Sequence, residues 1–334
     1  MKLLLLSDGR PGHANLSEGI VAALARNRSA TIERMDVSRG RWPGPIAALS
    51  TRSILPDERI LSMIYGIEPA TLPAADIVVS AGSETLAANI CVARLLGAQN
   101  VFYGSLRQYR ASDFTLVLTS YAQSVKAPNI VQAMKPSALD PDTIPLVQFE
   151  QSPRRLGLLI GGGTNGISYS PRDWQQLSQL TMEVWDAFGV DWIISNSRRT
   201  PVEATTLFRN KAMTSDAIHA FIDIKDPNSS PLSDLFSDVD GVICTADSSS
   251  MISEGIWARR PMLSLSPRTF KVTRKENQYR GWLEQNGWYA HAKLADISAQ
   301  NLLDLLAKLR PLRDNPLDRF AALLAQHLNL PEPL

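Results

Sequence analysis

Short apolar runs alternate with amphipathic stretches along the first part of the chain. The apolar runs lie at 2–8, 31–37, 76–82, 100–105 and 114–120, and helical patterns lie at 17–27 and 84–97. Runs that are mostly apolar suit the strands of a parallel sheet covered on both faces, and the amphipathic stretches suit the covering helices. The pattern therefore predicts a doubly wound α/β domain.

Between 127 and 155 prolines recur and no period is sustained, so we interpret this stretch as a link between domains. The alternation then restarts, with strand-and-turn segments at 155–166, 190–201, 220–224, 241–250 and 261–267, and with helical patterns at 172–189, 201–212, 231–240, 251–260, 298–309 and 316–328. We expect two Rossmann-like domains, residues 1–140 and 141–334. Their strands should end at a central cleft, where open α/β sheets bind ligands.

Composition narrows the class of protein. The 334 residues carry 34 Lys and Arg against 33 Asp and Glu, a net charge of +1, so no overall field favours nucleic acid. Cys91 and Cys244 lie in apolar runs and suit buried structural thiols. The first apolar run ends at Ser7, and no run approaches the ~18 apolar residues of a membrane span, so we expect a cytoplasmic protein that touches membranes only at its surface.

The turn GGGTNG at 161–166 follows the first apolar run of the second part. Consecutive glycines let a ligand approach closely and expose N–H groups to phosphate oxygens, which makes Gly161, Gly162, Gly163 and Thr164 candidate donor-binding residues. The turn is neither a GxGxxG fingerprint nor a Walker loop, and a simple strand-to-helix turn is the alternative.

Two adjacent arginines follow the next strand in SNSRRTP, 195–201. Arg198 and Arg199, with Ser197 beside them, can clamp a diphosphate. An ordinary solvated loop is the alternative.

The segment TADSSSMISEG, 245–255, offers more small hydroxyls than one helix cap needs. If a helix starts near Ser250, its first N–H groups and positive dipole end favour an anion, and Glu254 can reach ribose hydroxyls. The candidate donor residues here are Asp247, Ser248, Ser249, Ser250, Met251, Ser253 and Glu254. Simple capping is the alternative, although Met251 lies where a capping box with Glu254 would need Ser or Thr.

The first strand is followed by SDGRPGH, which places Asp8, Gly9, Gly12 and His13 on a glycine-rich turn. An imidazole there can act as general base toward an acceptor hydroxyl, although a lone His is more often a packing residue. The turn SAGSET, 80–85, with Gly82 and Ser83, can hold the acceptor or cap its helix. No metal-ligand spacing occurs.

The order and spacing of SDGRPGH, SAGSET, GGGTNG, SNSRRTP and TADSSSMISEG resemble the mitochondrial-fission Elm-like family, whose bacterial members carry a glycosyltransferase label. The resemblance implies the GT-B fold, a nucleotide-sugar donor held mainly by the C-terminal domain, no catalytic metal, and a last helix that crosses back over the first domain. The chain is more distantly similar to the N-acetylglucosaminyltransferase that completes the lipid-linked peptidoglycan precursor. That similarity implies Gly12-His13 beside the acceptor, Glu254 on the ribose and Gln278 toward the donor sugar.

We therefore expect a metal-independent glycosyltransferase without a cofactor. It would move a sugar from a UDP- or GDP-linked donor to a hydroxyl of a glycan or lipid-linked acceptor, such as a cell-envelope precursor. Asp8 or His13 would remove the acceptor proton, and Arg198 or Arg199 would stabilise the leaving diphosphate.

Three rivals remain: a nucleotide-sugar epimerase of the same fold, a non-catalytic scaffold related to organelle-fission factors, and a metal-dependent transferase. The last would want an Asp-x-Asp at a strand end, whereas DVD at 238–240 precedes its strand. A further stretch, SRGRWPGP at 38–45, combines Arg39, Arg41 and Trp42, and it suits either peripheral membrane contact or a solvated loop.

Overall fold

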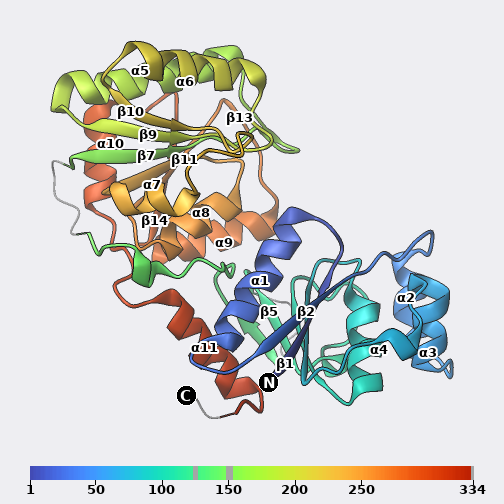
Figure 1. Cartoon of the computed structure of the whole chain (residues 1–334). Helices are drawn as coiled ribbons and strands as arrows, with labels where there is room; N and C mark the ends of the chain where they lie inside the picture. The colour runs from blue at the N-terminus through green and yellow to red at the C-terminus, as the bar shows by residue number, and fades with distance from the viewer. Residues whose placement is uncertain (123–126, 148–152, 332–334) are drawn as a thin grey trace. The chain divides into compact units, whose positions relative to one another are not determined.

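The structure is a computed structural model that describes residues 1–122, 127–147 and 153–331. The chain divides into two compact units (Figure 1). Unit 1 comprises Met1–Ala138 and Pro316–Leu334, and unit 2 comprises Leu139–Asn315. Each unit contains a six-stranded sheet whose paired strands are all parallel, so the α/β prediction is confirmed.

The sheet of unit 1 has the order β2-β1-β3-β4-β5-β6. Its strands are β1 (Lys2–Ser7), β2 (Thr31–Asp36), β3 (Ile77–Ala81), β4 (Gln99–Tyr103), β5 (Leu116–Thr119) and β6 (Ile130–Gln132). Its helices are α1 (Pro11–Ala25), α2 (Gly44–Ser50), α3 (Asp57–Ile60), α4 (Leu86–Leu96) and α11 (Pro316–His327), with a π-helical turn η1 (Leu61–Tyr65) and 3₁₀ turns η2 (Pro69–Thr71) and η3 (Ala111–Asp113).

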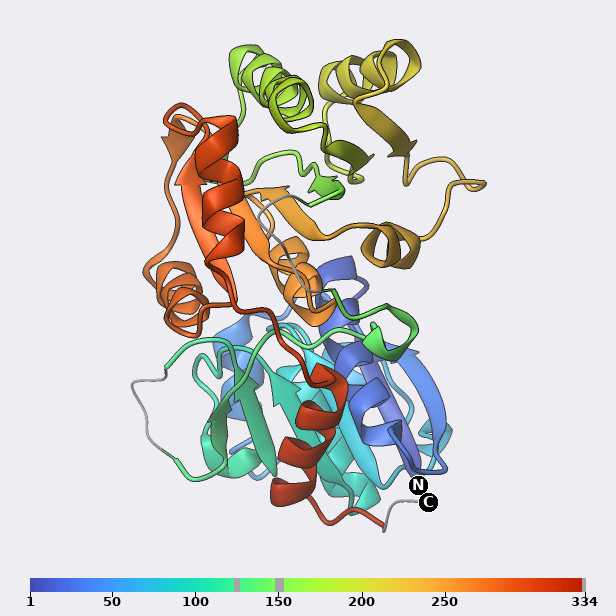
Figure 2. The same ribbon diagram turned by 90° about the vertical axis from the view of Figure 1, so that its left-hand side faces the viewer.

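The leucine run of β1 is buried because helices cover both faces of this sheet. Leu4 and Leu6 pack in a core that includes α4, and the alternate Leu3 and Leu5 are equally buried on the opposite face. Helix α11 packs along α1, from which it is separated by almost the whole sequence (Figures 1 and 2), and Arg26 Nε donates to Asp318 Oδ1 at 2.7 Å. The last helix therefore belongs to unit 1.

The sheet of unit 2 has the order β10-β9-β7-β11-β12-β14. Its strands are β7 (Arg155–Leu159), β9 (Asp191–Ser195), β10 (Ile218–Ile222), β11 (Gly241–Thr245), β12 (Met262–Ser266) and β14 (Tyr289–Lys293), and an antiparallel pair joins β8 (Ile167–Ser168) to β13 (Thr269–Phe270). Its helices are α5 (Pro171–Phe188), α6 (Val202–Thr214), α7 (Leu232–Asp238), α8 (Ser249–Trp257), α9 (Arg274–Gln285) and α10 (Ala299–Ala307), with a 3₁₀ turn η4 (Pro141–Thr143).

Strand order reverses once in each sheet. In unit 1 the chain leaves β1 toward β2 on one side and continues from β3 on the other, and in unit 2 the same reversal separates β7 from β11. The loops after the two strands diverge at such a point and leave room for a ligand at the carboxyl edge. The carboxyl edges of the two sheets are therefore the candidate ligand-binding sites.

Three stretches differ from the sequence prediction. Helix α1 starts at Pro11 rather than near residue 17, because proline is favoured in a first helical turn, so Gly12 and His13 are helical rather than part of a loop. Within the predicted link 127–155, residues Ile130–Gln132 form an edge strand, and 148–152 lie outside the described residues. Helix α9 and strand β14 have no counterpart in the sequence prediction, since 274–285 is mostly polar.

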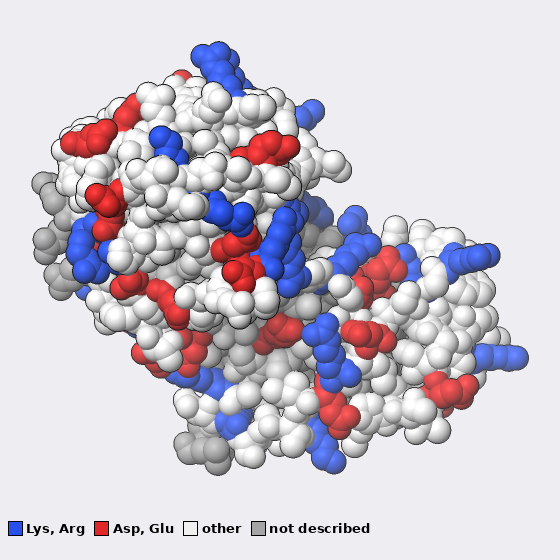
Figure 3. All heavy atoms as spheres, turned by 45° about the horizontal axis from the view of Figure 1, so that its top comes forward, with Lys and Arg blue, Asp and Glu red and all other residues white. Residues whose placement is uncertain are grey.

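Cys91 and Cys244 are buried free thiols, as predicted. Among the described residues, no helix combines the length and apolar character that crossing a membrane requires. On the face that Figure 3 shows, basic and acidic side chains are interspersed, in keeping with the balanced net charge.

Candidate functional site

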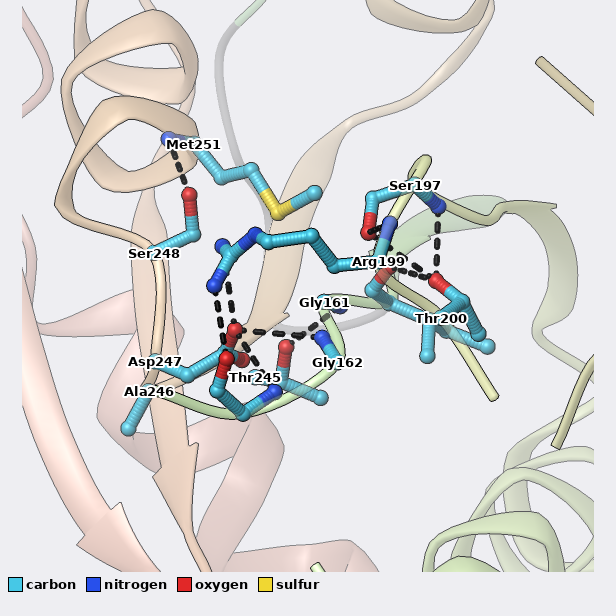
Figure 4. Close-up of polar contacts among 12 residues, drawn as sticks. Gly161, Gly162, Ser197, Arg199, Thr200, Thr245, Ala246, Asp247, Ser248 and Met251 are labelled. Atoms are coloured by element: carbon cyan, nitrogen blue, oxygen red, sulfur yellow. Dashed lines mark hydrogen bonds and ion pairs between the residues drawn. The ribbon is translucent and has the colours of Figure 1, made fainter. Parts of the chain in front are cut away.

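The reversal point of unit 2 is organised around the carboxylate of Asp247 (Figure 4). The Asp247 side chain has no solvent exposure, and its Oδ2 accepts hydrogen bonds from the N–H groups of Gly162 and Gly163, both at 3.1 Å. The N–H of Gly161 donates to Thr245 Oγ1 at 2.7 Å. The glycine N–H groups that the sequence suggested for phosphate are thus occupied by side chains from the end of β11, because β7 and β11 are neighbours.

The glycines are required here by space. A Cβ at Gly162 would lie 1.8 Å from the carbonyl oxygen of Arg199, and a Cβ at Gly161 would lie 2.3 Å from Asp247 Oδ1. Contacts this short do not occur in folded proteins, so any side chain would force the loops apart. The glycine turn brings three loops together rather than leaving N–H groups free.

Arg199 ties the loop after β9 to the same point. Its Nη2 lies 3.2 Å from Asp247 Oδ2 and its Nη1 donates to the carbonyl of Gly163 at 2.7 Å, while almost half of the side chain is exposed. The turn is fixed by Thr200, whose Oγ1 accepts from the N–H of Ser197 and donates to the carbonyl of Ile160, both at 2.7 Å. Arg198 is exposed and points a second cation from this turn toward solvent.

Helix α8 begins next to this cluster. Ser248 is its N-cap and accepts from the N–H of Met251 at 3.4 Å, so no capping box forms with Glu254, as predicted. Ser249 and Ser250 occupy the first turn, where backbone N–H groups lack intrahelical acceptors and the helix dipole is positive. An anion is favoured at this helix end.

Two residues that the sequence analysis missed hold the peptide just before Asp247. The N–H of Ala246 donates to the Tyr169 hydroxyl at 2.7 Å, and its carbonyl accepts from Arg280 Nη2 at 2.7 Å. Tyr169 follows β8 and Arg280 lies on α9, so neither is near Ala246 in the sequence. In the sequence, the signals for these two hydrogen bonds are weak: an aromatic residue after a glycine turn and an arginine in a polar segment.

Glu254 lies in the middle of α8 and is half-buried. No partner for its carboxylate is found in the described part of the chain, and burial raises the pKa of the Glu254 carboxyl from its ordinary value of 4.5 to about 7. A carboxylate kept without an internal partner in this position is available to a ligand, at a cost in stability.

The remaining donor candidates separate into exposed and internal residues. Ser253 is buried, and its hydroxyl lies 2.7 Å from the Tyr279 hydroxyl, a hydrogen bond that joins α8 to α9. Thr164 is exposed in the turn before β8, where its backbone exchanges hydrogen bonds with that of Ile167. Gln278 is exposed on α9. Thus Arg198, Ser250 and Gln278 stay open to solvent or partly so.

Unit 1 brings Asp8 and His13 together at its own reversal point. Asp8 follows β1 and its side chain is 2% exposed, with Oδ2 lying 2.7 Å from Nδ1 of His13. The other oxygen, Oδ1, accepts from the N–H of Arg10 at 3.2 Å. Because a carboxylate only accepts, Nδ1 carries the proton and Nε2 is left with its lone pair. Asp8 therefore orients the imidazole.

Gly82 follows β3 and makes room for this pair. Its φ is +92°, and a Cβ there would lie 2.2 Å from His13 Nδ1. His13, Gly82 and Ser83 line a cavity of about 230 Å³, whose other lining residues are Arg10, Leu16, Phe102, Tyr103, Gly104, Ser105 and Arg107. The predicted residues His13, Gly82 and Ser83 do meet, while Gly9 shapes the preceding turn with φ +73° and Gly12 lies in α1.

No group of three or more His, Cys, Asp and Glu side chains arranged to hold a metal ion occurs in the part of the chain that the structure describes. The cationic groups around the unit 2 cluster come from arginines and from the start of α8.

The sequence of the chain matches a known protein family. The family described as Mitochondrial fission ELM1 matches residues 11–328. The uncharacterized protein RP120 of Rickettsia prowazekii (strain Madrid E) is 28% identical over 113 residues, which cover 34% of this chain and 32% of that protein. This chain thus matches only about a third of the length of the rickettsial relative.

Solved structures with the same fold cover nearly the whole chain. MurG of Acinetobacter baumannii is 15% identical with a TM-score of 0.51, covering 97% of this chain and 99% of MurG. The UDP-GlcNAc 2-epimerase of Neisseria meningitidis, solved with UDP-GlcNAc, is 12% identical with a TM-score of 0.53, covering 98% and 99%. At these identities the likeness concerns the fold alone, which is GT-B-like as predicted.

Proposed function

The chain belongs to the mitochondrial fission ELM1 family, and from its GT-B-like fold and its two polar sites we propose that it is a glycosyltransferase. It would move a sugar from a nucleoside diphosphate sugar to the hydroxyl of a glycan or lipid-linked acceptor. The observation that carries this proposal is the Asp8–His13 pair, which presents an oriented imidazole to a cavity of about 230 Å³ in unit 1. A base that faces a pocket of its own suits a second substrate.

Unit 2 would hold the donor. The diphosphate would lie at the first turn of α8, where Ser249 and Ser250 offer hydroxyls and the helix end is positive. Arg198 and the exposed part of Arg199 would add cationic donors from the loop after β9. Asp247 would keep the role it has now, since it holds the glycine loop and Arg199 in place.

Glu254 would recognise the ribose. Its carboxylate has an unoccupied acceptor capacity, and two vicinal hydroxyls can donate to its two oxygens. Gln278 would face the donor sugar, as the resemblance implies. The base of the nucleotide would be uracil or guanine.

In the proposed reaction, His13 Nε2 takes the proton of the acceptor hydroxyl while that oxygen attacks the anomeric carbon. The bond between the anomeric carbon and the phosphate oxygen breaks, and its electron pair leaves on the diphosphate. The arginines and the start of α8 stabilise this developing charge, so the reaction needs no metal. Asp8 stabilises the imidazolium that forms on His13.

The first test is thermal unfolding with UDP, GDP, dTDP, ADP and CDP in EDTA, using the wild type and Glu254→Ala. A ligand at a hundred times its dissociation constant stabilises the folded state by about 2.7 kcal/mol. We expect one diphosphate to raise the melting temperature of the wild type and to raise that of Glu254→Ala much less. If no diphosphate shifts the well-folded wild type, the donor assignment is wrong.

The second test uses the sugar form of the diphosphate that binds, with a membrane lipid extract as acceptor source. Release of the diphosphate should depend on the extract and should fall strongly in His13→Asn, whereas His219→Asn, on the exposed face of β10, should behave like the wild type. An epimerase would instead change the donor sugar with no acceptor present. The buried carboxyl of Glu254, with its pKa near 7, is the feature that favours that second candidate.

A further inference from the structure

Exposed apolar side chains are concentrated in one short segment of unit 1. Eleven large apolar residues are exposed in the described part of the chain, and five of them fall between 46 and 63, namely Ile46, Leu49, Ile54, Leu55 and Met63. The other six are spread over the rest of the sequence. Single exposed apolar residues need no explanation, but such a concentration marks an interaction surface. We call residues 41–63 the apolar segment.

Local structure turns these side chains outward. In α2, Ala47, Ala48 and Ser50 face the core, while Ile46 and Leu49 face solvent, with Leu49 65% exposed. A water-exposed helix face normally carries polar residues. The following loop presents Ile54 with 102% relative exposure, and Leu55 next to it. Figure 1 shows α2 and α3 together on the outer side of α4, at the margin of unit 1.

Basic residues accompany the apolar ones. Arg41, Arg52 and Arg59 are exposed in the same segment, and no carboxylate partner of Arg41 or Arg59 occurs among the described residues. The segment has two acidic residues against these three arginines. Asp57 Oδ1 lies 3.6 Å from Arg94 Nη1, and Glu58 is exposed. Trp42 lies half-buried at the start of the segment, and its Nε1 donates to the carbonyl of Met63 at 3.0 Å. Apolar side chains flanked by arginines and a tryptophan fit the interface of an anionic bilayer.

The apolar segment is also fastened to the loop that lines the His13 cavity. Arg39, just before it, donates to Glu84 Oε1 at 2.9 Å, and the Tyr65 hydroxyl, just after it, donates to the carbonyl of Glu84 at 2.9 Å. Ser83, the neighbour of Glu84, is one of the residues that line the cavity. Whatever binds the apolar segment is therefore held at a fixed position relative to that cavity.

We propose that residues 41–63 are a membrane-contact surface, with Ile54, Leu55 and Leu49 inserted into the interfacial layer of an anionic bilayer and with the arginines on lipid phosphates. The segment holds unit 1 with the His13 cavity next to the lipid headgroups. The binding itself stands independently of the proposed transferase activity.

A second copy of the chain is the competing occupant. A two-fold contact through the segment would bring Arg41, Arg52 and Arg59 of both copies close together, and like charges oppose such an interface. An anionic lipid surface instead matches these charges.

The test is sedimentation of the full chain with vesicles of phosphatidylcholine alone and of phosphatidylcholine mixed with phosphatidylglycerol. We expect binding to the mixed vesicles, weaker binding to the neutral ones, and loss on raising the salt concentration. Ile54→Asp should bind the mixed vesicles at least about tenfold more weakly, since one inserted isoleucine is lost and a charge is added. Met213→Asp, on α6 of unit 2 with 78% exposure, is the matched control and should bind like the wild type.

Both substitutions lie on exposed side chains, so the thermal unfolding of both variants should match the wild type. Equal binding of Ile54→Asp and the wild type, or no binding to mixed vesicles, would overturn the proposal. A dimer in light scattering that Ile54→Asp dissociates would assign the segment to a second copy instead. Diphosphate binding by unit 2 should be unchanged in Ile54→Asp, so this experiment fails or succeeds separately from the proposed function.

Discussion

Replacing Glu254 with glutamine should make the protein more stable and a poorer binder of its ligand. Glutamine keeps the size of the side chain and removes the charge. Burial raises the pKa of the Glu254 carboxyl from 4.5 to about 7 in the folded state, so the folded protein holds a proton that the unfolded chain releases. The contribution of this carboxyl to the stability of the folded wild type is therefore fully present below pH 4.5 and is lost as the pH rises through 7.

The size of the effect follows from the difference of 2.5 pH units between the two values. Each unit corresponds to about 1.36 kcal/mol, so ionised Glu254 costs about 3 kcal/mol at pH 8. Glu254→Gln does not ionise and avoids this cost. We expect its free energy of unfolding to exceed that of the wild type by less than about 0.5 kcal/mol at pH 4.5 and by about 3 kcal/mol at pH 8.

Urea unfolding followed by tryptophan fluorescence is the suitable assay, because six of the seven tryptophans, all except Trp42, lie in unit 2 together with Glu254. Glu203→Gln is the matched control, since Glu203 is exposed in the first turn of α6 and its substitution should change stability by a similar small amount at both pH values. The same Glu254→Gln protein should bind the diphosphate at least about tenfold more weakly, since it loses a charged acceptor for ribose.

Two results would refute this reasoning. One is a stability change that is the same at pH 4.5 and pH 8, which would mean that the folded carboxyl titrates as it does in the unfolded chain. The other is a more stable variant with unchanged diphosphate affinity, which would leave the burial intact but remove Glu254 from the binding site.

Three further predictions follow from the same contacts. If ligand hydroxyls need ionised Glu254, the wild-type dissociation constant for the diphosphate should be about tenfold higher at pH 6 than at pH 8, as calorimetry can measure, and a constant value would exclude that contact. His13→Asn should lower transfer by a factor of about 10² to 10⁴ with donor affinity unchanged, and Asp8→Asn should lower it as well, because the amide no longer fixes the tautomer; equal rates for all three proteins would contradict the base assignment. Gly162→Ala should strongly lower the melting temperature, since its Cβ would meet a backbone oxygen at 1.8 Å. Gly281→Ala, within helix α9 and with open space around it, should instead raise stability by roughly 0.5–1 kcal/mol, and the opposite order in differential scanning calorimetry would contradict the packing described.

Much of the fold can be predicted from the sequence because parallel strands that are buried on both faces consist of nearly continuous apolar runs. KLLLLS and GVICT are the clearest cases, and both form interior strands of their sheets. Helix α9 could not be predicted in this way, since only Tyr279, Arg280 and Leu283 of its twelve residues are buried and the segment has no apolar stripe to reveal it.

The positions of the candidate sites are easier to predict from the sequence than the hydrogen bonds within them. Polar residues after strands mark the carboxyl edge of a parallel sheet, which locates both reversal points. The sequence does not show that β7 lies beside β11, and only that neighbourhood lets Asp247 reach Gly162, 85 positions away. For the same reason the hydrogen bond from the Ala246 N–H to the Tyr169 hydroxyl could not be predicted from the sequence.

The location of Asp8 and His13 illustrates the opposite case. The two residues are five apart, and the helix that starts at Pro11 brings the imidazole back onto the carboxylate that ends the strand. From the sequence alone, either residue can be the base. Asp8 is buried and both its oxygens accept hydrogen bonds, which leaves the proton transfer to His13.

The central claim is that unit 2 binds a nucleoside diphosphate at the start of α8, beside the arginine turn. Isothermal titration calorimetry in EDTA tests this claim with the diphosphate that raises the melting temperature most. We predict one site per chain in the wild type, with affinity at least about tenfold weaker in Arg198→Ala and unchanged in Arg172→Ala, an exposed arginine of α5. Wild-type protein that is folded and takes up no nucleoside diphosphate, or equal affinity in both arginine variants, would contradict the claim.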